Sequence, residues 1–566
     1  MSYTPRIIVR DDRLIEDRII MIRRVIIFAL VLACSACSGP TGESASDNAP
    51  DTRPNILLIV ADDLGYADLG AYGSDIDTPR IDQLAAQGIL FTQFHTAPMC
   101  APSRAMLLSG NNNGIAGVAS QNRFGLAGIP FPGYEGKLSD RIAPLPRLMQ
   151  SSGYDTYMVG KWHLGFGDDE SPRAAGFSHS FSILAGGGTH FDNLGYYEGG
   201  ATYREDGEIT TYPDGIYSTA FYTDKLIKYI ESDKNNGQPF FAYAAYTSPH
   251  WPLQVPDDYL DLYREHYDDG YDALRERRFE SLQEAGIVPL DATLPPRNPA
   301  ITPWEELTKE QQKSEAREME LYASMVDNLD DHLGRLLDYL IDNDLYDNTL
   351  IVVMGDNGAA AEDFYNEIPY AGYTPYLRKN FDNSYGNMGT ANSFVAYGAE
   401  WAEAGSAPFQ RRKGYLQEGG IVAPMIISGP GVKGSGVIDS SYMTIMDLAP
   451  TFLDLAGAKY PDDGSVRPML GESMISFLSG DDDRIHDEDY VTVMHHRGRA
   501  LVRKDRWKIV TMDPPFDESK FELFDVISDP GETNNLAESE PEIYSELLDT
   551  WRTERKNLGI VLPADL

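Results

Sequence analysis

Short, uninterrupted apolar runs recur along the chain between longer polar and amphipathic stretches. They are rich in Val, Ile and aromatic residues, which is typical of strands buried on both faces of a mostly parallel sheet. Such runs occupy residues 55–61, 156–160, 240–246, 349–354 and 424–428. We therefore predict an α/β fold built on one large sheet.

Two intervening stretches have the periodicity of helices. In the first, 78–88, Thr78 suits the N-cap, Pro79 the first helical position and Gly88 the C-terminal stop. The second runs from about 318 to 340 and carries an apolar stripe on one face. The residues of this stripe are Tyr322, Val326, Leu329, Leu333 and Leu337. Both helices are predicted to cover the sheet.

Three long insertions show neither the apolar runs of buried strands nor the periodicity of amphipathic helices. Residues 186–215 are rich in Gly and Tyr, 257–312 are charged, and 362–407 are polar. We predict irregular loops there, and loops of this size in a compact enzyme usually shape or cover a substrate pocket.

Acidic side chains follow two of the predicted strands. Asp62 and Asp63 come directly after the first run, and Asp356 and Asn357 follow 349–354. Ligands of open α/β sheets bind at the carboxyl ends of strands, and oxygen donors suit a hard divalent cation such as Ca²⁺ or Mg²⁺. One such pair alone is more often an Asp in a turn. Two pairs in matching positions favour a metal site.

Composition narrows the class of protein. The chain has 566 residues, 42% of them hydrophobic, which is enough for one large core and a subdomain. Its formal net charge of −40 argues against nucleic-acid binding, which needs clustered Lys and Arg. Most of this charge is expected on a solvated surface. An anionic substrate would then require a local concentration of cations at the site.

The N-terminus has the pattern of an export signal. Met21–Arg24 gives a charged start, and Val25–Leu32 is an apolar run too short to span a bilayer but long enough for a signal-peptide core. Cys34 and Cys37 follow, and then a polar tether over 38–53.

This segment resembles a bacterial lipoprotein signal. Residues 1–20 carry both acids and bases and fit no signal, so we expect the true start at Met21. The resemblance implies a signal over 21–37, acylation of Cys34 or Cys37, and a lipid anchor. We expect an exported protein that faces the periplasm from the outer membrane of a Gram-negative bacterium. A plain secretory signal is the alternative.

Cys100 is the one cysteine beyond that signal. Pro102 suits the first turn of a helix, residues 105–108 can propagate it, and Gly110 can end it. Cys100 would then lie at a helix N-terminus, where an anion is favoured, with Arg104 on the same face. A buried cysteine that packs as a small hydrophobe is the alternative.

The motif C-A-P-S-R, followed by A-M-L-L-S-G, closely resembles the signature of type I (formylglycine-dependent) sulfatases. A second signature, G-Y-D-T-Y-M-V-G-K-W-H, occupies 153–163. Further matching stretches occur in the family's order at 61–65, around His250, at 355–358, around Lys413 and at 522–537. Residues 392–402 resemble the bacterial arylsulfatase branch. Ser109 departs from the usual threonine but keeps the hydroxyl.

The resemblance assigns roles to these residues. A maturation enzyme would oxidise Cys100 to formylglycine, whose hydrate is the family's nucleophile. The metal, Ca²⁺ with Mg²⁺ or Mn²⁺ as alternatives, would lie beside residue 100 and be held by Asp62, Asp63, Asp356 and Asn357. The groups around the sulfate would be Arg104, Lys161, His163, His250 and Lys413.

Two of these groups are expected to act on the leaving oxygen, namely His250 and Lys413, and Asp356 is the candidate base. Considered singly, a lysine is more often a solvated surface group and a histidine a satisfied core residue. Their positions after predicted strands favour the functional interpretation.

The resemblance also implies an alkaline-phosphatase-like fold. A catalytic domain would cover 54–480, with a large mixed, mostly parallel sheet flanked by helices. A smaller C-terminal α+β subdomain would cover 485–566, with leading strands in 499–510 and a helix over 541–557.

The implied function is hydrolysis of sulfate monoesters, with aryl sulfates as the favoured substrates. Phosphonate monoesters or phosphodiesters, and sulfated glycans, remain open as alternative substrates. A non-catalytic surface lipoprotein is less favoured, because no ligand position is substituted.

Overall fold

The computed structural model describes residues 51–121, 125–126, 129–366 and 372–562. The predicted signal, 21–37, and most of the tether lie outside the described residues. Within the described part of the chain, no helix is both long and apolar enough to cross a membrane.

A ten-stranded sheet forms the centre of the fold, in the order β13-β2-β12-β11-β1-β10-β6-β7-β8-β9. Its middle contains all five predicted strands: β1 (Asn55–Ala61), β6 (Asp155–Lys161), β10 (Phe240–Ala245), β11 (Thr349–Gly355) and β12 (Met425–Ser428). β1 pairs in parallel with β10 and β11, and every residue of β1 is buried. Burial on both faces explains the unbroken apolar runs.

Shorter strands extend this sheet on both sides. They are β2 (Ile89–Phe91), β7 (His179–Ile183), β8 (Tyr203–Glu205), β9 (Glu208–Thr210) and β13 (Val437–Asp439). β12 pairs antiparallel with β11 and β2, and β8 pairs antiparallel with β7 and β9. The sheet is therefore mixed and mostly parallel at its centre, as predicted.

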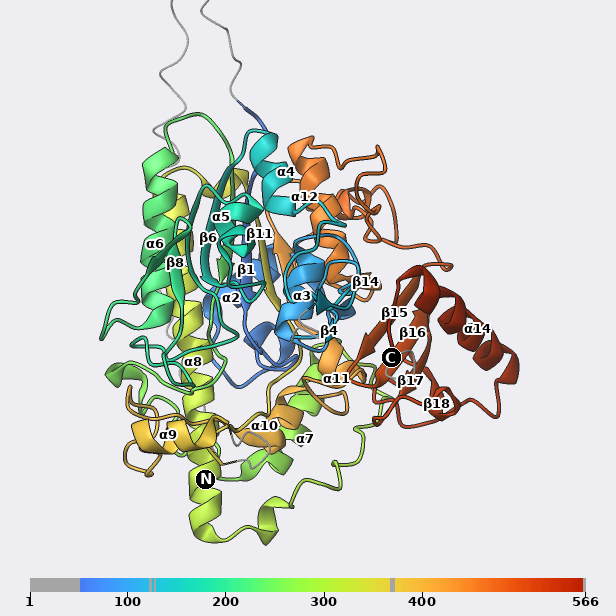
Figure 1. The fold of residues 1–566 in the computed structure, drawn as a ribbon. Helices are drawn as coiled ribbons and strands as arrows, with labels where there is room; N and C mark the ends of the chain where they lie inside the picture. Colours follow the sequence, from blue (N-terminus) through green and yellow to red (C-terminus); the bar gives the residue numbers. More distant parts are fainter. Residues whose placement is uncertain (1–50, 122–124, 127–128, 367–371, 563–566) are drawn as a thin grey trace, which may run out of the picture. The chain divides into compact units, whose positions relative to one another are not determined.

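Helices cover both faces of this sheet (Figure 1). In Figure 1 the strands lie between α6 and α8 on one side and α4 and α12 on the other, and α6 contacts both α8 and β10. The helices outside the C-terminal part are α2 (Pro79–Gln87), α3 (Cys100–Leu107), α4 (Leu145–Ser151), α5 (Pro172–Ala175), α6 (Ser218–Asp233), α7 (Gly270–Glu284), α8 (Lys309–Asp342), α9 (Thr374–Asn380), α10 (Gly398–Gly405), α11 (Glu418–Ile421), α12 (Leu448–Ala456) and α13 (Ile475–Leu478).

The two predicted helices are present: α2 begins at Pro79 and stops at Gly88 as predicted, whereas α8 begins earlier than predicted. Thr78 occupies the N-cap position of α2, but its side chain makes no capping bond, because its hydroxyl accepts from the Gly70 N–H and donates to Asp82. α8 begins at Lys309, well before the predicted start, behind a capping box formed by Thr308 and Gln311. The apolar stripe begins only after these first polar turns. A prediction from the stripe alone therefore placed the N-terminus of this helix too far along the chain.

The prediction of irregular structure in the insertions was partly wrong. The charged insertion contains α7, and the polar insertion contains α9 and α10. α7 lacks a clean apolar stripe because its buried face includes Arg278, which pairs with buried Asp68. A helix with a charged residue on its buried face is missed when helices are predicted from apolar periodicity alone.

The C-terminal part is an antiparallel sheet with one helix. The sheet has the order β15 (Val491–His496), β16 (Arg499–Lys504), β17 (Trp507–Thr511), β18 (Phe521–Asp525), and α14 (Pro541–Asn557) packs on it through Trp551. This confirms an α+β subdomain. Its leading strand is β15, however, and the predicted 499–510 stretch forms the second and third strands.

Two further two-stranded sheets complete the described strands. One joins β3 (Phe94–His95) to β14 (Met443–Thr444), and the other joins β4 (Gly125–Leu126) to β5 (Ile129–Pro130).

Candidate active site

The carboxyl ends of two central strands bring four oxygen-bearing side chains together. β1 and β11 pair in parallel so that Ala61 is opposite Gly355. The next residues are therefore neighbours across the sheet: Asp62 and Asp63 on one strand, Asp356 and Asn357 on the other. All four are buried.

The backbone turns sharply at this edge. Asp63 has φ of +65°, in the left-handed region that non-glycine residues rarely adopt, and its N–H donates to Asp356 Oδ1 at 3.2 Å. The Asn357 amide donates to Asp63 Oδ1 at 2.7 Å. Strained backbone of this kind is typical of functional sites.

Cys100 lies at the start of α3, directly beside this acidic edge. Its thiol is buried and lies 3.4 Å from Asp63 Oδ1. The hydroxyl of Ser103 fixes the entry to the helix, because it accepts from the Ala97 N–H and donates to the Ala97 carbonyl oxygen. The predicted placement of Cys100 at a helix N-terminus is confirmed.

The donor set fits a divalent cation. Ligand atoms of Asp62, Asp63, Cys100 and His250 lie within 4.8 Å of one another. In addition, the buried Oδ1 of Asn357 has no hydrogen-bond partner within the described part of the chain. An orphaned carbonyl oxygen beside carboxylates is what a hard cation would satisfy. His250, predicted only as a catalytic group, thus also borders the cation site.

Each carboxylate of the site has a buried cation beside it. The Lys161 ammonium lies 2.8 and 2.6 Å from the two oxygens of Asp62. The Lys413 ammonium donates to Asp63 Oδ2 at 2.7 Å.

The Arg104 guanidinium donates to Asp356 Oδ2 through Nε at 3.0 Å and Nη2 at 2.8 Å. Its Nη1 donates to the carbonyl oxygen of Lys161. The acidic composition implied that a site for an anionic substrate needs a local concentration of cations. Lys161, Lys413 and Arg104 supply that concentration here.

Burial and these pairs act on the pKa values of the site. Burial raises the pKa of Asp63, but Lys413 and His250 outweigh it, and the pKa ends below its usual range. Burial opposes charge on Lys413, yet Asp63 raises the pKa of its ammonium well above the usual value. Burial, followed by Asp63, raises the pKa of the Cys100 thiol far above its ordinary value. An unmodified Cys100 is thus a protonated, poor nucleophile.

Two histidines face the same cluster. His250 Nδ1 donates to the Trp251 carbonyl oxygen at 2.6 Å, which leaves Nε2 3.3 Å from Asp63 Oδ2. Burial lowers the pKa of His250 to about 3. His163 has φ of +58°, and burial followed by Lys161 lowers its pKa well below the usual value.

Two glycines allow both imidazoles to approach the backbone. A Cβ on Gly186 would lie 2.6 Å from His163 Cε1, and one on Gly187 would lie 2.9 Å from His250 Cε1. Neither glycine was singled out as a site residue from the sequence. The run of three glycines at 186–188 inside a predicted insertion was the available signal.

His190 is a second residue that the sequence reasoning missed. Its Nε2 lies 3.1 Å from the His250 carbonyl oxygen, and its Nδ1 lies 2.7 Å from the Ser218 hydroxyl. Burial lowers its pKa to about 4. His190 therefore supports the backbone of a site residue without reaching the site itself.

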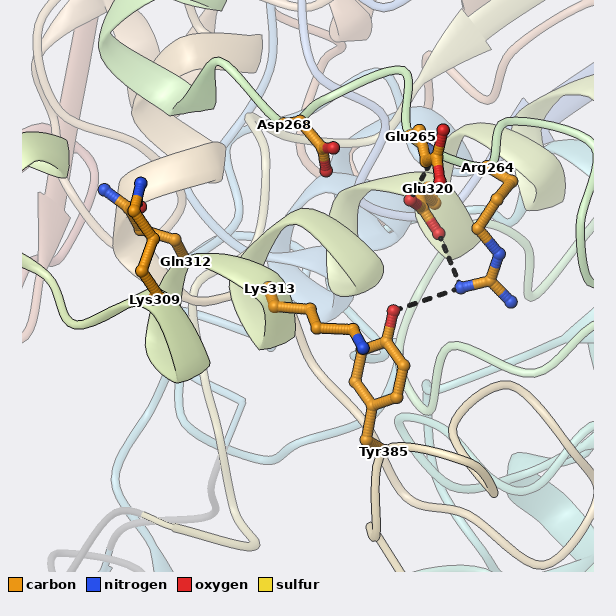
Figure 2. A pocket seen from close by; sticks show the side chains of 8 residues that line it. All are labelled: Arg264, Glu265, Asp268, Lys309, Gln312, Lys313, Glu320 and Tyr385. Atoms are coloured by element: carbon orange, nitrogen blue, oxygen red, sulfur yellow. Dashed lines mark hydrogen bonds and ion pairs between the residues drawn. The ribbon is translucent and has the colours of Figure 1, made fainter.

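A separate cavity of about 490 Å³ lies at the start of α8 and shares no residue with this cluster (Figure 2). Figure 2 shows Lys309, Lys313 and Glu320 on this helix, and Arg264 pairs with Glu320 from another segment. The basic and acidic side chains that line this cavity balance one another, so the cavity has no excess of positive charge to attract an anion.

The fold and the cluster together define the site of an α/β enzyme, in which a hard cation and several buried basic groups can hold one small anion. The chain belongs to the sulfatase family: the sulfatase model matches residues 54–458. A second model, described as N-sulphoglucosamine sulphohydrolase, C-terminal, matches residues 409–557. The protein is a sulfuric ester hydrolase, of a family that depends on a metal and carries formylglycine.

Relatives agree with this family. An uncharacterized sulfatase of Schizosaccharomyces pombe is 38% identical over 542 residues, which cover 91% of this chain and 96% of the relative. An arylsulfatase of Klebsiella aerogenes is 40% identical over 439 residues, covering 75% and 92%. Among solved structures, the crystal structure of Ps i-CgsB has a TM-score of 0.64 at 25% identity, covering 88% of this chain and 92% of that one.

Proposed function

We propose that this sulfatase acts on aryl sulfates with a formylglycine made from Cys100 and with Ca²⁺ as its metal. The observation that carries the proposal is the position of the buried Cys100 thiol. It lies at a helix N-terminus, 3.4 Å from Asp63, and Lys161 and Lys413 contact the adjacent carboxylates. The hydrate of a formylglycine at this position supplies two hydroxyl groups on one carbon, one to attack sulfur and one to release the sulfate.

The basic side chains of the cluster bind and orient the sulfate. Lys161 and Lys413 each lie within 3 Å of a carboxylate and can turn one N–H towards a sulfate oxygen without leaving it. Arg104 is held by two bonds to Asp356 and so presents a fixed positive charge. Charge placed in advance where the transition state needs it is usually the largest contribution to catalysis.

His250 is the group proposed to protonate the leaving oxygen. Its Nδ1–H donates to the Trp251 carbonyl oxygen, so Nε2 faces the cluster and carries a proton only in the imidazolium form. Burial opposes that form, whereas Asp63, 3.3 Å from Nε2, favours it, so the proposed donor is an imidazolium paired with Asp63. A positioned proton donor typically contributes about 10²- to 10⁴-fold in rate. Asp356 remains the candidate base, and burial raises the pKa of its carboxyl group.

A divalent cation held by Asp62, Asp63, Asp356 and Asn357 would neutralise sulfate charge and polarise its S–O bonds. Ca²⁺ is proposed because Asp62, Asp63, Asp356 and Asn357 offer carboxylate and amide oxygens, which suit a hard cation. Cys100 and His250 lie within the same cluster but have other roles in this proposal, as the precursor of the nucleophile and as the proton donor.

The aryl preference is supported by the arylsulfatase relative from Klebsiella aerogenes. A structure in complex with D-glucosamine-2-N,6-O-disulfate has a TM-score of 0.58 at 21% identity, which speaks for the fold alone. Glycan sulfates therefore have less support as substrates of this chain.

Parallel assays on four ester classes test the proposal. Purified protein is incubated with phenyl sulfates, sulfated oligosaccharides, a phosphodiester and a phosphonate monoester, with Ca²⁺ or after chelation. We expect release from the aryl sulfate to dominate, to fall on chelation and to return with Ca²⁺. Faster hydrolysis of the phosphonate or phosphodiester would contradict the proposed substrate class.

We also keep export and lipidation of Cys34 or Cys37 as a proposal, which rests on the apolar run over 25–32 and the two cysteines after it. Mass spectrometry of the mature N-terminus tests it. A diacylglyceryl cysteine at either position supports the anchor, and a free N-terminus beyond residue 38 contradicts it.

A further inference from the structure

An aromatic cluster adjoins the catalytic residues and is not part of the main hydrophobic core. We call it the aromatic wall and define it by Tyr196, Trp251, Phe364 and Tyr373. The ring of Trp251 lies 5.7 Å from Tyr196 and 4.6 Å from Phe364, measured between centroids. Tyr373 stacks on Phe364 at 5.0 Å with an interplanar angle of 15°.

The wall is continuous with the catalytic histidine. The rings of His250 and Trp251 lie 4.2 Å apart, and Trp251 also supplies the carbonyl oxygen that fixes His250 Nδ1. Tyr196 contacts this group through the Trp251 ring. Burial, followed by Tyr197 and Tyr373, raises the pKa of its phenol, and Cys100 and Lys413 have smaller effects on that pKa.

The rings of the wall differ in exposure. Trp251 is 6% exposed, whereas Tyr196, Phe364 and Tyr373 are only partly buried. They come from three segments that are distant in sequence, so their convergence beside His250 is a product of the fold. Since His250 faces the leaving oxygen, the group attached to that oxygen must pass beside these rings.

A carboxylate, that of Glu362, lies between the aromatic wall and Lys413. Glu362 precedes Phe364 by two residues, and its Oε2 lies 3.8 Å from the Lys413 ammonium. That oxygen is buried and makes no hydrogen bond within the described ranges. Lys413 lies 2.7 Å from Asp63 and 3.8 Å from Glu362, so among the described residues Glu362 shares its cation with a closer carboxylate.

We propose that the aromatic wall and Glu362 form the leaving-group subsite, which accepts flat, uncharged aromatic alcohols and disfavours anionic ones such as uronic-acid-containing glycans. This inference rests on the proposed sulfatase reaction and deepens it. The rings select by stacking on the aryl group. Glu362 selects by repelling a second negative charge on the leaving group.

The size of the ring effect follows from ordinary aromatic contacts. Each such pair contributes about 0.5–1.5 kcal/mol beyond burial, which corresponds to about 2- to 12-fold in kcat/KM. The repulsion by Glu362 acts at short range in a site of reduced dielectric, where like charges disfavour one another strongly. The two effects can be measured separately.

The ring effect is tested with Tyr196→Leu and Tyr373→Leu. Phenyl sulfate is compared with a fluorinated alkyl sulfate whose alcohol has a similar pKa, so that leaving-group chemistry is matched. We expect each variant to lower kcat/KM for phenyl sulfate by about 3- to 10-fold and to leave the fluoroalkyl ester within about twofold.

Two matched controls accompany these variants. Tyr373→Phe keeps the ring and should keep the aryl preference. Tyr385→Leu alters a partly exposed tyrosine of the separate cavity in Figure 2 and should change neither ester. Thermal melting of each variant identifies loss of structure.

The charge effect is tested with Glu362→Gln, with 4-carboxyphenyl sulfate and phenyl sulfate as the pair of substrates. We expect the ratio of their kcat/KM values to rise by about 5-fold or more, because the repelling carboxylate is gone. A glutamine keeps the size of the side chain, so the ratio reports charge.

The outcomes separate this inference from the proposed function. If the wild-type protein hydrolyses neither sulfate ester, the proposed function fails. If it hydrolyses both, and the Leu variants slow both equally while Glu362→Gln leaves the ratio unchanged, the sulfatase assignment stands and the leaving-group subsite is overturned. A selective loss on phenyl sulfate and a raised ratio support the subsite.

Discussion

Cys100 cannot act as an ordinary thiol nucleophile where it lies. Burial and Asp63 raise its pKa well above the ordinary value, and the ammonium groups of Lys161 and Lys413 offset this only in part. The same surroundings suit a neutral, hydrated group that is deprotonated only during attack. The residues around it keep one cation close to each of Asp62, Asp63 and Asp356, so these carboxylates are paired before a sulfate enters.

His250→Ala tests the residue that acts on the leaving oxygen. Nitrophenolate leaves readily without a proton, whereas an unactivated phenolate or an alkoxide does not. We expect the variant to lose up to about 10²- to 10⁴-fold on unactivated esters and far less on nitrophenyl sulfate. The measurement is kcat/KM across a series of substituted phenyl sulfates.

Arg104→Ala is the matched comparison, because Arg104 addresses the sulfate that every substrate shares. It should slow all members of the series by similar factors. Parallel plots of log kcat/KM against leaving-group pKa for wild type and His250→Ala would contradict the proton-donor role.

Gly186→Ala tests whether the close approach of His163 matters. The added Cβ would meet the imidazole at 2.6 Å, so the ring must move while the surrounding fold is retained. Because small displacements in a site cost about 10²-fold, we expect a loss of that order in kcat/KM. Gly386→Ala, with open space around the new Cβ, should be close to wild type. Equal activity of the two variants would show that His163 has no positional role.

At the scale of elements, the sequence predicted best where one physical signal dominates. β1 and β11 are buried on both faces, so their unbroken apolar runs located them and the acidic residues after them. Of the predicted residues, Cys100, His250 and Lys413 each contact Asp63.

The sequence predicted poorly where tertiary contacts decide. α7 carries Arg278 on its buried face, and its partner Asp68 is distant in sequence. The same holds for His190 and the aromatic wall, whose members meet only after the sheet has formed. A local sequence pattern carries no information on which distant residues will pair in the folded chain.

Lys508 is the main ionic link between the C-terminal sheet and α11. It lies on β17, is fully buried, and pairs with Glu418 at 2.6 Å and Glu532 at 2.9 Å. Lys508→Met removes the cation that pairs with buried Glu532 and one of the partners of Glu418, which keeps His95 and Arg503. Breaking a buried pair in this way typically costs about 3–5 kcal/mol. We expect a clear fall in melting temperature at pH 8. Lys504→Met, on the adjacent strand β16 and paired only with exposed acids, should cost about 1 kcal/mol at most.

The pH dependence of this effect has a definite sign. Burial raises the pKa of Glu532 from 4.5 to about 7. Between these values the folded chain binds a proton that the unfolded chain does not, so lowering the pH through this window favours the folded state. The loss in Lys508→Met should therefore be smaller at pH 5 than at pH 8. A loss that is independent of pH, or equal to that of Lys504→Met, would contradict the buried link.

At the scale of the whole molecule, a net charge of −40 opposes the approach of a sulfate ester. Raising the salt from about 10 mM to about 150 mM shortens the Debye length from about 30 Å to about 8 Å, which screens the surface charge but not the buried cations. We expect kcat/KM for phenyl sulfate to rise about twofold or more. A zwitterionic aryl sulfate with a trimethylammonium group should change less, and a fall in rate for phenyl sulfate would show that the global field does not limit capture.

The central claim is that activity resides in a formylglycine made from Cys100. The most direct measurement combines peptide mass spectrometry of residues 97–104 with sulfate release, on preparations made with and without a formylglycine-generating enzyme. The account predicts that turnover per molecule rises in proportion to the fraction of chains that carry the aldehyde at residue 100, and that Cys100→Ser loses most turnover. Full activity in a preparation that contains only the free thiol would contradict it.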